Sequence, residues 1–159
     1  MTEYLYGEGV VIMQAKDIMT HDPITVGPKT TVREIAELLI NHKISGLPVV
    51  DDEGEVLGMV SEGDLMRKEI APKAPEMLSI LGAIIYYDGL KEYREAFRKM
   101  SATTAEEIMT SKVIAVQPDE DISQVGQLML DHQIKRVPVL LDNRLVGIIS
   151  RSDMVKMML

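Results

Sequence analysis

Cysteine and tryptophan are absent from this sequence of 159 residues, and only one phenylalanine and five tyrosines are present. Without cysteine the chain can form no disulfide, no thiolate zinc site and no cysteine nucleophile, which favours an intracellular, cytoplasmic protein. Because aromatic side chains are so few, we expect a core built from valine, isoleucine, leucine and the twelve methionines.

Long apolar runs and an excess of basic residues are also missing. No run approaches the roughly 18 apolar residues that span a bilayer, and residues 1–13 lack the basic start and the cleavage site of a secretory signal. Acidic residues outnumber basic ones by 25 to 17, which gives a net charge of −8. Because nucleic acids need a concentrated basic face, the charge argues against them as main partners, and no membrane partner is expected.

What the sequence does contain is an internal repeat with an offset of 90 residues. The segment AKDIMTHDPITV from Ala15 matches AEEIMTSKVIAV from Ala105 without a gap. One residue is lost in a later turn, after which three positions of the first copy correspond to three of the second: Gly58, Ser61 and Asp64 to Gly147, Ser150 and Asp153.

Each copy predicts the order β-α-β-β-α, so the fold class is α/β (α+β). A short strand (24–26 or 114–116) precedes a helix, a β-hairpin and a last helix that begins at the Ser-x-x-Asp motif. A copy of about 50 residues is marginal by itself, so we expect two copies packed sheet to sheet about a pseudo-twofold axis, with ligand clefts beside it. The expected divisions are an N-terminal extension (1–14), repeat 1 (15–68), a helical insert (69–104) and repeat 2 (105–159).

Neither a catalytic constellation nor a metal-binding cluster is visible in the sequence. His42 and His132 occupy the same position of the two copies, near the end of a predicted helix, where a cation is stabilised by the helix dipole. We therefore expect a structural role for both histidines, no metal and no enzymatic activity.

The repeated Ser-x-x-Asp motif has two compatible interpretations. Ser61 with Asp64, and Ser150 with Asp153, fit a capping box at a helix N-terminus. An aspartate in that position can also accept hydrogen bonds from neutral hydroxyls, for which a ribose diol is a suitable partner.

The two copies differ just before the first strand of the hairpin. The first copy has the neutral segment Ser45-Gly46-Leu47-Pro48, whereas the second has Lys135-Arg136-Val137-Pro138. Such a pair of cations is usually solvated, but this pair, with Arg151 just inside the last helix, could also meet a phosphate.

Two copies of strand, helix and I-x-x-h-P-V hairpin ending in G-h-h-S-x-x-D resemble a tandem pair of CBS (cystathionine-β-synthase-like) domains, the unit called a Bateman module. The resemblance covers about Ala15 to Arg67 and Ala105 to Met158. It implies a regulatory or energy-sensing module that binds AMP, ADP, ATP or S-adenosylmethionine, with no required cofactor. It also implies that Asp64 and Asp153 hold ribose hydroxyls, helped by Ser61 and Ser150.

The resemblance further implies that each cleft combines both repeats. One cleft would join Ser61 and Asp64 to Ile114, Ala115, Lys135, Arg136, Val137 and Pro138. The other would join Ser150, Arg151 and Asp153 to Ile24, Thr25, Ser45, Gly46, Leu47 and Pro48. Because the first contains the basic pair, we expect it to be the main site for AMP or ATP, and the second to bind a less charged ligand, to bind weakly or to be empty.

The connection between the repeats is long for this family. A short helix over Pro75–Leu81 that stops at Gly82, and a second helix with Leu90, Tyr93, Phe97 and Met100 on one face, are expected. This insert would be a helical subdomain that packs on the module or on a second subunit, or a lid with Tyr86 or Tyr87 near a base.

The sequence therefore favours a stand-alone sensor of adenine nucleotides that acts on an unknown regulated protein through a change of conformation. A structural dimerisation module with vestigial clefts is the alternative, and an enzyme is poorly supported. A homodimer is expected, with apolar residues near the C-terminus as candidate contacts: Met154, Val155, Met157, Met158 and Leu159.

Overall fold

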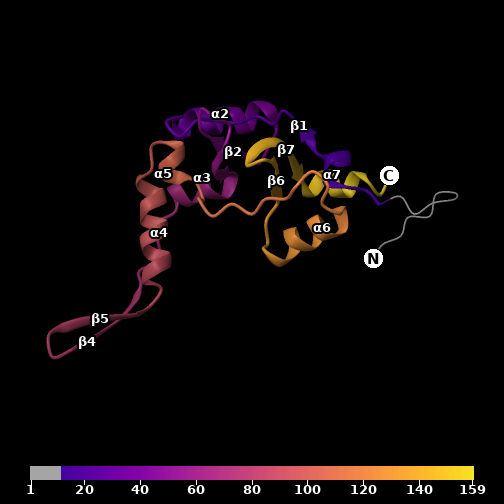
Figure 1. Cartoon of the computed structure of the whole chain (residues 1–159). Coiled ribbons are helices and arrows are strands. Elements are labelled where there is room, and N and C mark those ends of the chain that lie inside the picture. The colour runs from indigo at the N-terminus through magenta and orange to yellow at the C-terminus, as the bar shows by residue number, and fades with distance from the viewer. Residues whose placement is uncertain (1–11) are drawn as a thin grey trace. The chain divides into compact units, whose positions relative to one another are not determined.

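The structure, a computed structural model, describes residues 12–159, so most of the N-terminal extension expected at 1–14 lies outside the described residues. Two compact units make up the chain (Figure 1). Unit 1 combines residues 12–25 with Val50–Val56 and Lys112–Leu159, and unit 2 combines Val26–Val49 with Leu57–Ser111.

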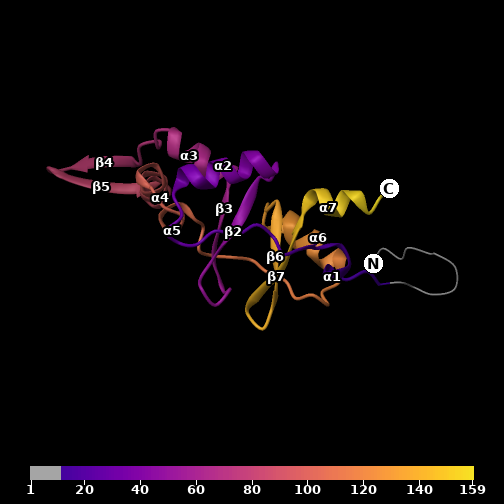
Figure 2. The same ribbon diagram turned by 90° about the horizontal axis from the view of Figure 1, so that it is seen from above.

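Unit 1 is built on an antiparallel sheet with the strand order β1-β7-β6. Helices α6 and α7 lie beside β6 and β7 (Figure 2). Its core contains Val125, Met129, Val137 and Ile149, all almost fully buried. Its elements are α1 (Ala15–Ile18), β1 (Thr20–His21), α6 (Ile122–Asp131), β6 (Arg136–Leu141), β7 (Arg144–Ser150) and α7 (Arg151–Lys156).

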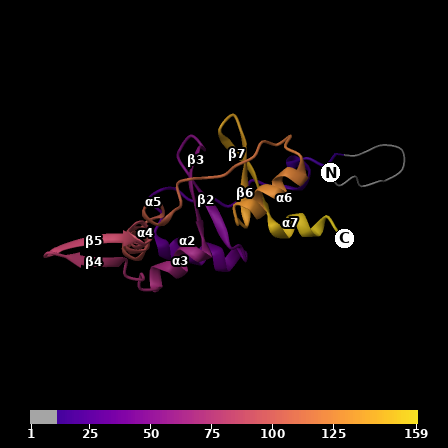
Figure 3. The ribbon, with the colours of Figure 1, turned by 90° about the horizontal axis from the view of Figure 1, so that it is seen from below.

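Unit 2 contains the paired strands β2 and β3, helices α2 and α3 side by side, and the insert (Figure 3). Ile35, Leu47, Val60 and Ile108 are fully buried in it. Its elements are α2 (Val32–His42), β2 (Gly46–Val50), β3 (Val56–Ser61), α3 (Glu62–Glu69), β4 (Glu76–Ile80), β5 (Ala83–Asp88), α4 (Leu90–Ser101) and α5 (Ala105–Ile108), with the tip of the β2–β3 hairpin assigned to unit 1.

The predicted hairpins and the helices at both Ser-x-x-Asp motifs are confirmed. The short strands predicted at 24–26 and 114–116 are reduced to single parallel bridges, Val26 to Val49 and Val116 to Val139. Pro28 and Pro118 follow closely, and because proline lacks an N–H group the ladder does not continue there.

The first residues of each repeat pack within the unit that holds most of the other repeat. The Ala15 N–H donates to the Glu120 carbonyl at 2.8 Å in unit 1. The Ala105 N–H donates to the Thr30 carbonyl at the same distance in unit 2. The matching segments Ile18-Met19-Thr20 and Ile108-Met109-Thr110, the IMT segments, are therefore exchanged between the repeats.

The helix predicted over Pro75–Leu81 is wrong. Strands β4 and β5 form an antiparallel hairpin, and Ile80 pairs with Ala83 across the two-residue turn Leu81-Gly82. Both turn residues have positive φ, 50° and 82°, as a type I′ turn requires. The residues that follow, AIIYY, are rich in β-branched and aromatic side chains, which favour a strand.

The second helix predicted in the insert is confirmed as α4, where the rings of Tyr93 and Phe97 stack with centroids 6.4 Å apart. From its N-terminal end the β4–β5 hairpin projects away from the rest of unit 2 (Figures 1 and 3). Within residues 12–159, no helix is long and apolar enough to cross a bilayer.

Candidate functional site

The two Ser-x-x-Asp motifs adopt the same local geometry. Oδ2 of Asp64 accepts from the backbone N–H and the hydroxyl of Ser61, both at 2.8 Å. Oδ2 of Asp153 accepts from the same two groups of Ser150, at 2.8 and 2.6 Å. Each serine is the N-cap of the helix that follows, so the capping interpretation is confirmed. Because capping uses Oδ2, the ligand interpretation depends on Oδ1.

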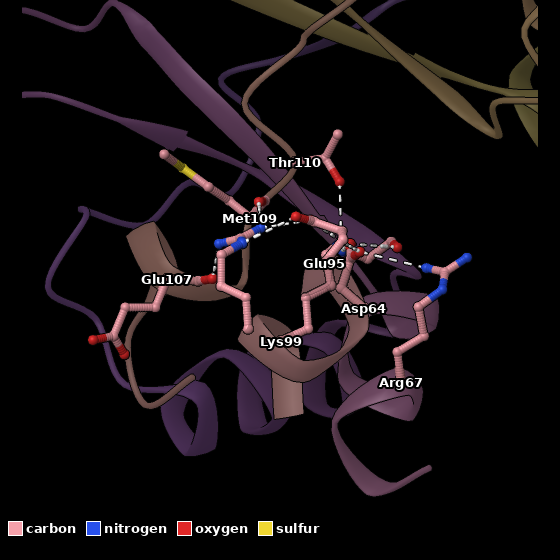
Figure 4. A network of polar contacts seen from close by, with 9 residues as sticks. Asp64, Arg67, Glu95, Lys99, Glu107, Met109 and Thr110 are labelled. Carbon is pink, nitrogen blue, oxygen red and sulfur yellow. Dashed lines mark hydrogen bonds and ion pairs between the residues drawn. The ribbon is translucent and has the colours of Figure 1, made fainter. Parts of the chain in front are cut away.

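The Oδ1 atom of Asp64 is engaged inside the protein (Figure 4). Nζ of Lys99, on α4, donates to it, and both side chains are only 6% exposed. Nη1 of Arg67 lies 3.5 Å from the same oxygen. The Lys99 ammonium also donates to Oγ1 of Thr110 at 3.2 Å and lies 3.9 Å from Oε1 of Glu95. The aspartate expected to hold ribose is therefore already paired with two cations.

Asp153 is in a more open environment. Its Oδ1 accepts from Nζ of Lys156, one turn along the same helix, at 3.3 Å, and the Lys156 side chain is 72% exposed. Burial acts to raise the pKa of Asp153, but hydrogen bonds from Ser150 and Lys156 outweigh it and the pKa lies below its ordinary value. Asp153 is therefore an ionised acceptor at neutral pH, facing a cation that can turn into solvent.

The basic pair lies next to the Ser150 motif in unit 1. In the β6–β7 hairpin Arg136 is paired in register with Ser150, and the Arg151 N–H donates to the Lys135 carbonyl at 3.0 Å. Lys135 is exposed and Arg136 is half-buried. The strand pairing therefore brings the basic pair to the N-terminus of α7.

Arg151 has a role inside unit 1. Its Nε donates to the Ile134 carbonyl at 2.9 Å and its Nη2 to the Met129 carbonyl at 3.3 Å. These two carbonyls belong to the end of α6 and the segment after it, so the guanidinium ties α7 to that region. The phosphate contact predicted for Arg151 stays a prediction.

The other predicted ligand residues lie at or near the strands in equivalent places. Gly46, Leu47, Pro48, Val137 and Pro138 are buried, and the two proline carbonyls accept from Val26 and Val116. The remaining members of this set are half-buried: Ser45, Ile24, Thr25, Ile114 and Ala115. Whether residues of both repeats share one cleft stays a prediction.

Lys99 is the residue of this region that sequence analysis missed. Arg98 beside it donates to the carbonyls of Glu107 and Met109, the latter at 3.2 Å, and so fixes α4 against the segment after it. The helical period gives no signal for it: successive helix residues point in directions about 100° apart, so Lys99 lies outside the stripe of Leu90, Tyr93, Phe97 and Met100 that the sequence predicts to be buried.

The chain belongs to the CBS domain family, whose model matches it twice, at residues 15–70 and 105–159. It is a tandem pair of CBS domains, as the sequence motifs predicted.

Known proteins resemble it over most of its length. Protein MJ1426 of Methanocaldococcus jannaschii is 30% identical over 153 residues, which cover 91% of this chain and 90% of that protein.

Two solved structures have the same fold. The CBS domain pair of protein MJ0100, in complex with 5′-methylthioadenosine and S-adenosyl-L-methionine, is 29% identical, with a TM-score of 0.69 and coverage of 93% of this chain and 97% of that one. CBSX2 in complex with AMP is 27% identical, with a TM-score of 0.76 and coverage of 91% and 95%. MJ0100 and CBSX2 thus both bind adenosine compounds.

Proposed function

We propose that this protein is a regulatory module that binds an adenosine-containing ligand and has no chemistry of its own. The family, and the adenosine compounds bound by MJ0100 and CBSX2, support the ligand class. The observation that carries the proposal is the carboxylate of Asp153: one oxygen caps α7 while the other faces an exposed lysine. A ribose diol has the two donors that such an oxygen can accept.

The charges near Asp153 favour a phosphorylated ligand. Lys135 and Arg136 stand at the β6–β7 edge next to the first turn of α7, where their cationic side chains favour an anion. AMP, ADP or ATP fits this setting better than S-adenosylmethionine, whose sulfonium is positive. This assignment reverses the preference suggested by the sequence, which put the phosphate with Asp64.

The regulated protein would respond to a ligand-dependent change of conformation or assembly. In this proposal the module works in the cytoplasm as a homodimer and reports the level of adenine nucleotides. Among the apolar residues proposed as dimer contacts, Val155, Met158 and Leu159 are exposed, whereas Met154 and Met157 pack on the core of unit 1.

Isothermal titration calorimetry with AMP, ATP and S-adenosylmethionine tests the proposal. We expect AMP or ATP to bind and Asp153→Ala to weaken binding at least tenfold, because the ribose acceptor is lost. Asp121→Ala is the matched control, since Asp121 caps α6 by accepting from Ser123 at 2.8 Å and should keep the affinity.

The second candidate is a structural dimerisation module with vestigial clefts. It predicts no heat of binding and no rise in melting temperature with any of the three compounds, whereas a ligand at 100 times its Kd stabilises a protein by about 2.7 kcal/mol.

For the first candidate, equal affinities of the wild type and Asp153→Ala for AMP would refute the assignment of the ribose site to Asp153.

A further inference from the structure

The insert between the two CBS repeats supplies the cation that is buried against the first Ser-x-x-Asp motif. We infer that Lys99 is a specificity-determining residue. Its ammonium occupies the oxygen of Asp64 that a ribose hydroxyl would use, so helix α4 of the insert competes with the ligand for Asp64. This inference rests on the proposed function, because it assumes that an open Asp64 would accept a ribose as Asp153 does.

Both carboxylate oxygens of Asp64 are in use. Ser61 donates twice to Oδ2, and Lys99 and Arg67 share Oδ1. The Lys99 ammonium adds Coulomb attraction to its hydrogen bond, whereas a neutral hydroxyl that donates to the same carboxylate contributes the hydrogen bond alone. A ribose hydroxyl would therefore have to replace a stronger donor, in a place where the displaced ammonium would lose its partner.

Burial makes this exchange unfavourable for Lys99. Its side chain is 6% exposed, so a released ammonium could not gain full hydration without moving away from the site. Breaking a buried ion pair by removing one partner is strongly destabilising because an uncompensated charge remains. The ion pair between Lys99 and Asp64 therefore stays formed unless helix α4, which carries Lys99, moves.

Helix α4 is held in place by further polar contacts. Arg98 donates to the carbonyls of Glu107 and Met109, and Nζ of Lys68 on α3 donates to the Met100 carbonyl at 2.9 Å. These contacts flank Lys99 on its own helix. Freeing the Asp64 carboxylate from Lys99 thus requires a shift of the C-terminal part of α4. Such a shift would couple ligand binding at Asp64 to the conformation of the insert.

The second repeat provides an internal comparison. Lys156 also donates to Oδ1 of its aspartate, but it lies on the same short helix and is 72% exposed, so it can turn into water at little cost. The two aspartates therefore differ in the donor that a ligand must displace. We infer that the wild type binds one adenine nucleotide per chain, at Asp153, while Lys99 keeps Asp64 closed.

The test is the number of AMP molecules bound per chain, measured by calorimetry and by native mass spectrometry. We expect one in the wild type and two in Lys99→Met, which keeps most of the apolar stem but removes the ammonium. Lys99→Gln, which keeps a neutral donor, is a second variant in case the first fails to fold. Lys29→Met, which removes an exposed ammonium paired with Glu106, is the matched control and should still bind one.

A second arm separates the two proposals. At AMP concentrations that just saturate the wild type, Asp153→Ala should bind little AMP because its affinity is at least tenfold lower, and adding Lys99→Met to it should restore one molecule per chain. Two molecules bound by the wild type, or one still bound by folded Lys99→Met and Lys99→Gln, would overturn the role of Lys99 and leave the proposed function intact. No binding by the wild type or by any variant would overturn both.

Discussion

The thioether of Met19 lies directly over Gly147 of strand β7. A Cβ atom at Gly147 would come within 2.4 Å of the Met19 sulfur and 3.1 Å of its Cβ. The equivalent contact is repeated in unit 2, where a Cβ at Gly58 would lie 2.5 Å from the Met109 sulfur and 3.0 Å from the Thr110 carbonyl oxygen. These contacts fix the exchanged IMT segments onto the hairpins, and both need a glycine.

Gly147→Ala is accordingly expected to destabilise the protein by about 1–3 kcal/mol, the usual range for an overpacked site. Urea denaturation would measure the change in the free energy of unfolding. Gly27→Ala is the matched control, because no atom lies within 4 Å of a Cβ at that position. Combining Gly147→Ala with Met19→Ala should recover part of the loss. A double variant no better than the sum of the two single ones would contradict the contact.

Acid should destabilise the protein through its helix caps. Glu107 accepts from the backbone N–H and hydroxyl of Thr103 and from the backbone N–H of Thr104, and these bonds lower its pKa below 4.5. Glu34 is held in the same way by Thr31, so its pKa is also lowered.

A carboxylate whose pKa is lower in the folded state contributes stability that is complete above its unfolded pKa. That contribution is lost as the pH falls from about 4.5 through the folded pKa. We expect the urea midpoint to drop over this interval, and the Glu34→Gln/Glu107→Gln variant to show a smaller drop. A variant curve parallel to that of the wild type would contradict the assignment.

The β4–β5 hairpin should add little to the stability of unit 2. Met77 and Leu78 are neighbours on β4 and point to opposite faces, yet they are 62% and 54% exposed, so neither face is covered. Deleting residues 76–88 and joining Pro75 to Gly89, which are close in space, should change the free energy of unfolding by less than about 1 kcal/mol, since little apolar area leaves a core.

Ile108→Ala is the reference for that deletion. Ile108 is fully buried, and truncating such a side chain costs about 2–5 kcal/mol. If the deletion destabilised the protein as much as Ile108→Ala does, the hairpin would have to be packed against the rest of the protein.

Much of this protein could be predicted from sequence because its determinants are local and occur twice. The hairpins, the helices at Ser61 and Ser150 and the capping role of both aspartates depend on residues within a few positions of each other. The offset of 90 residues makes each copy a check on the other. The insert has no second copy, and its apolar run before Gly82 fits a helix or a strand equally well by periodicity, which is why its first element was predicted wrongly.

By itself, the sequence determined the family, the repeated fold and the identity of the two candidate aspartates. Only the tertiary structure decided that Met19 and Met109 pack against the hairpins of opposite repeats, and that Asp64 and Asp153 differ. The reason is that burial and pairing depend on residues far apart in the chain. Lys99 lies 35 positions from Asp64, and no local pattern around either residue shows that they form an ion pair.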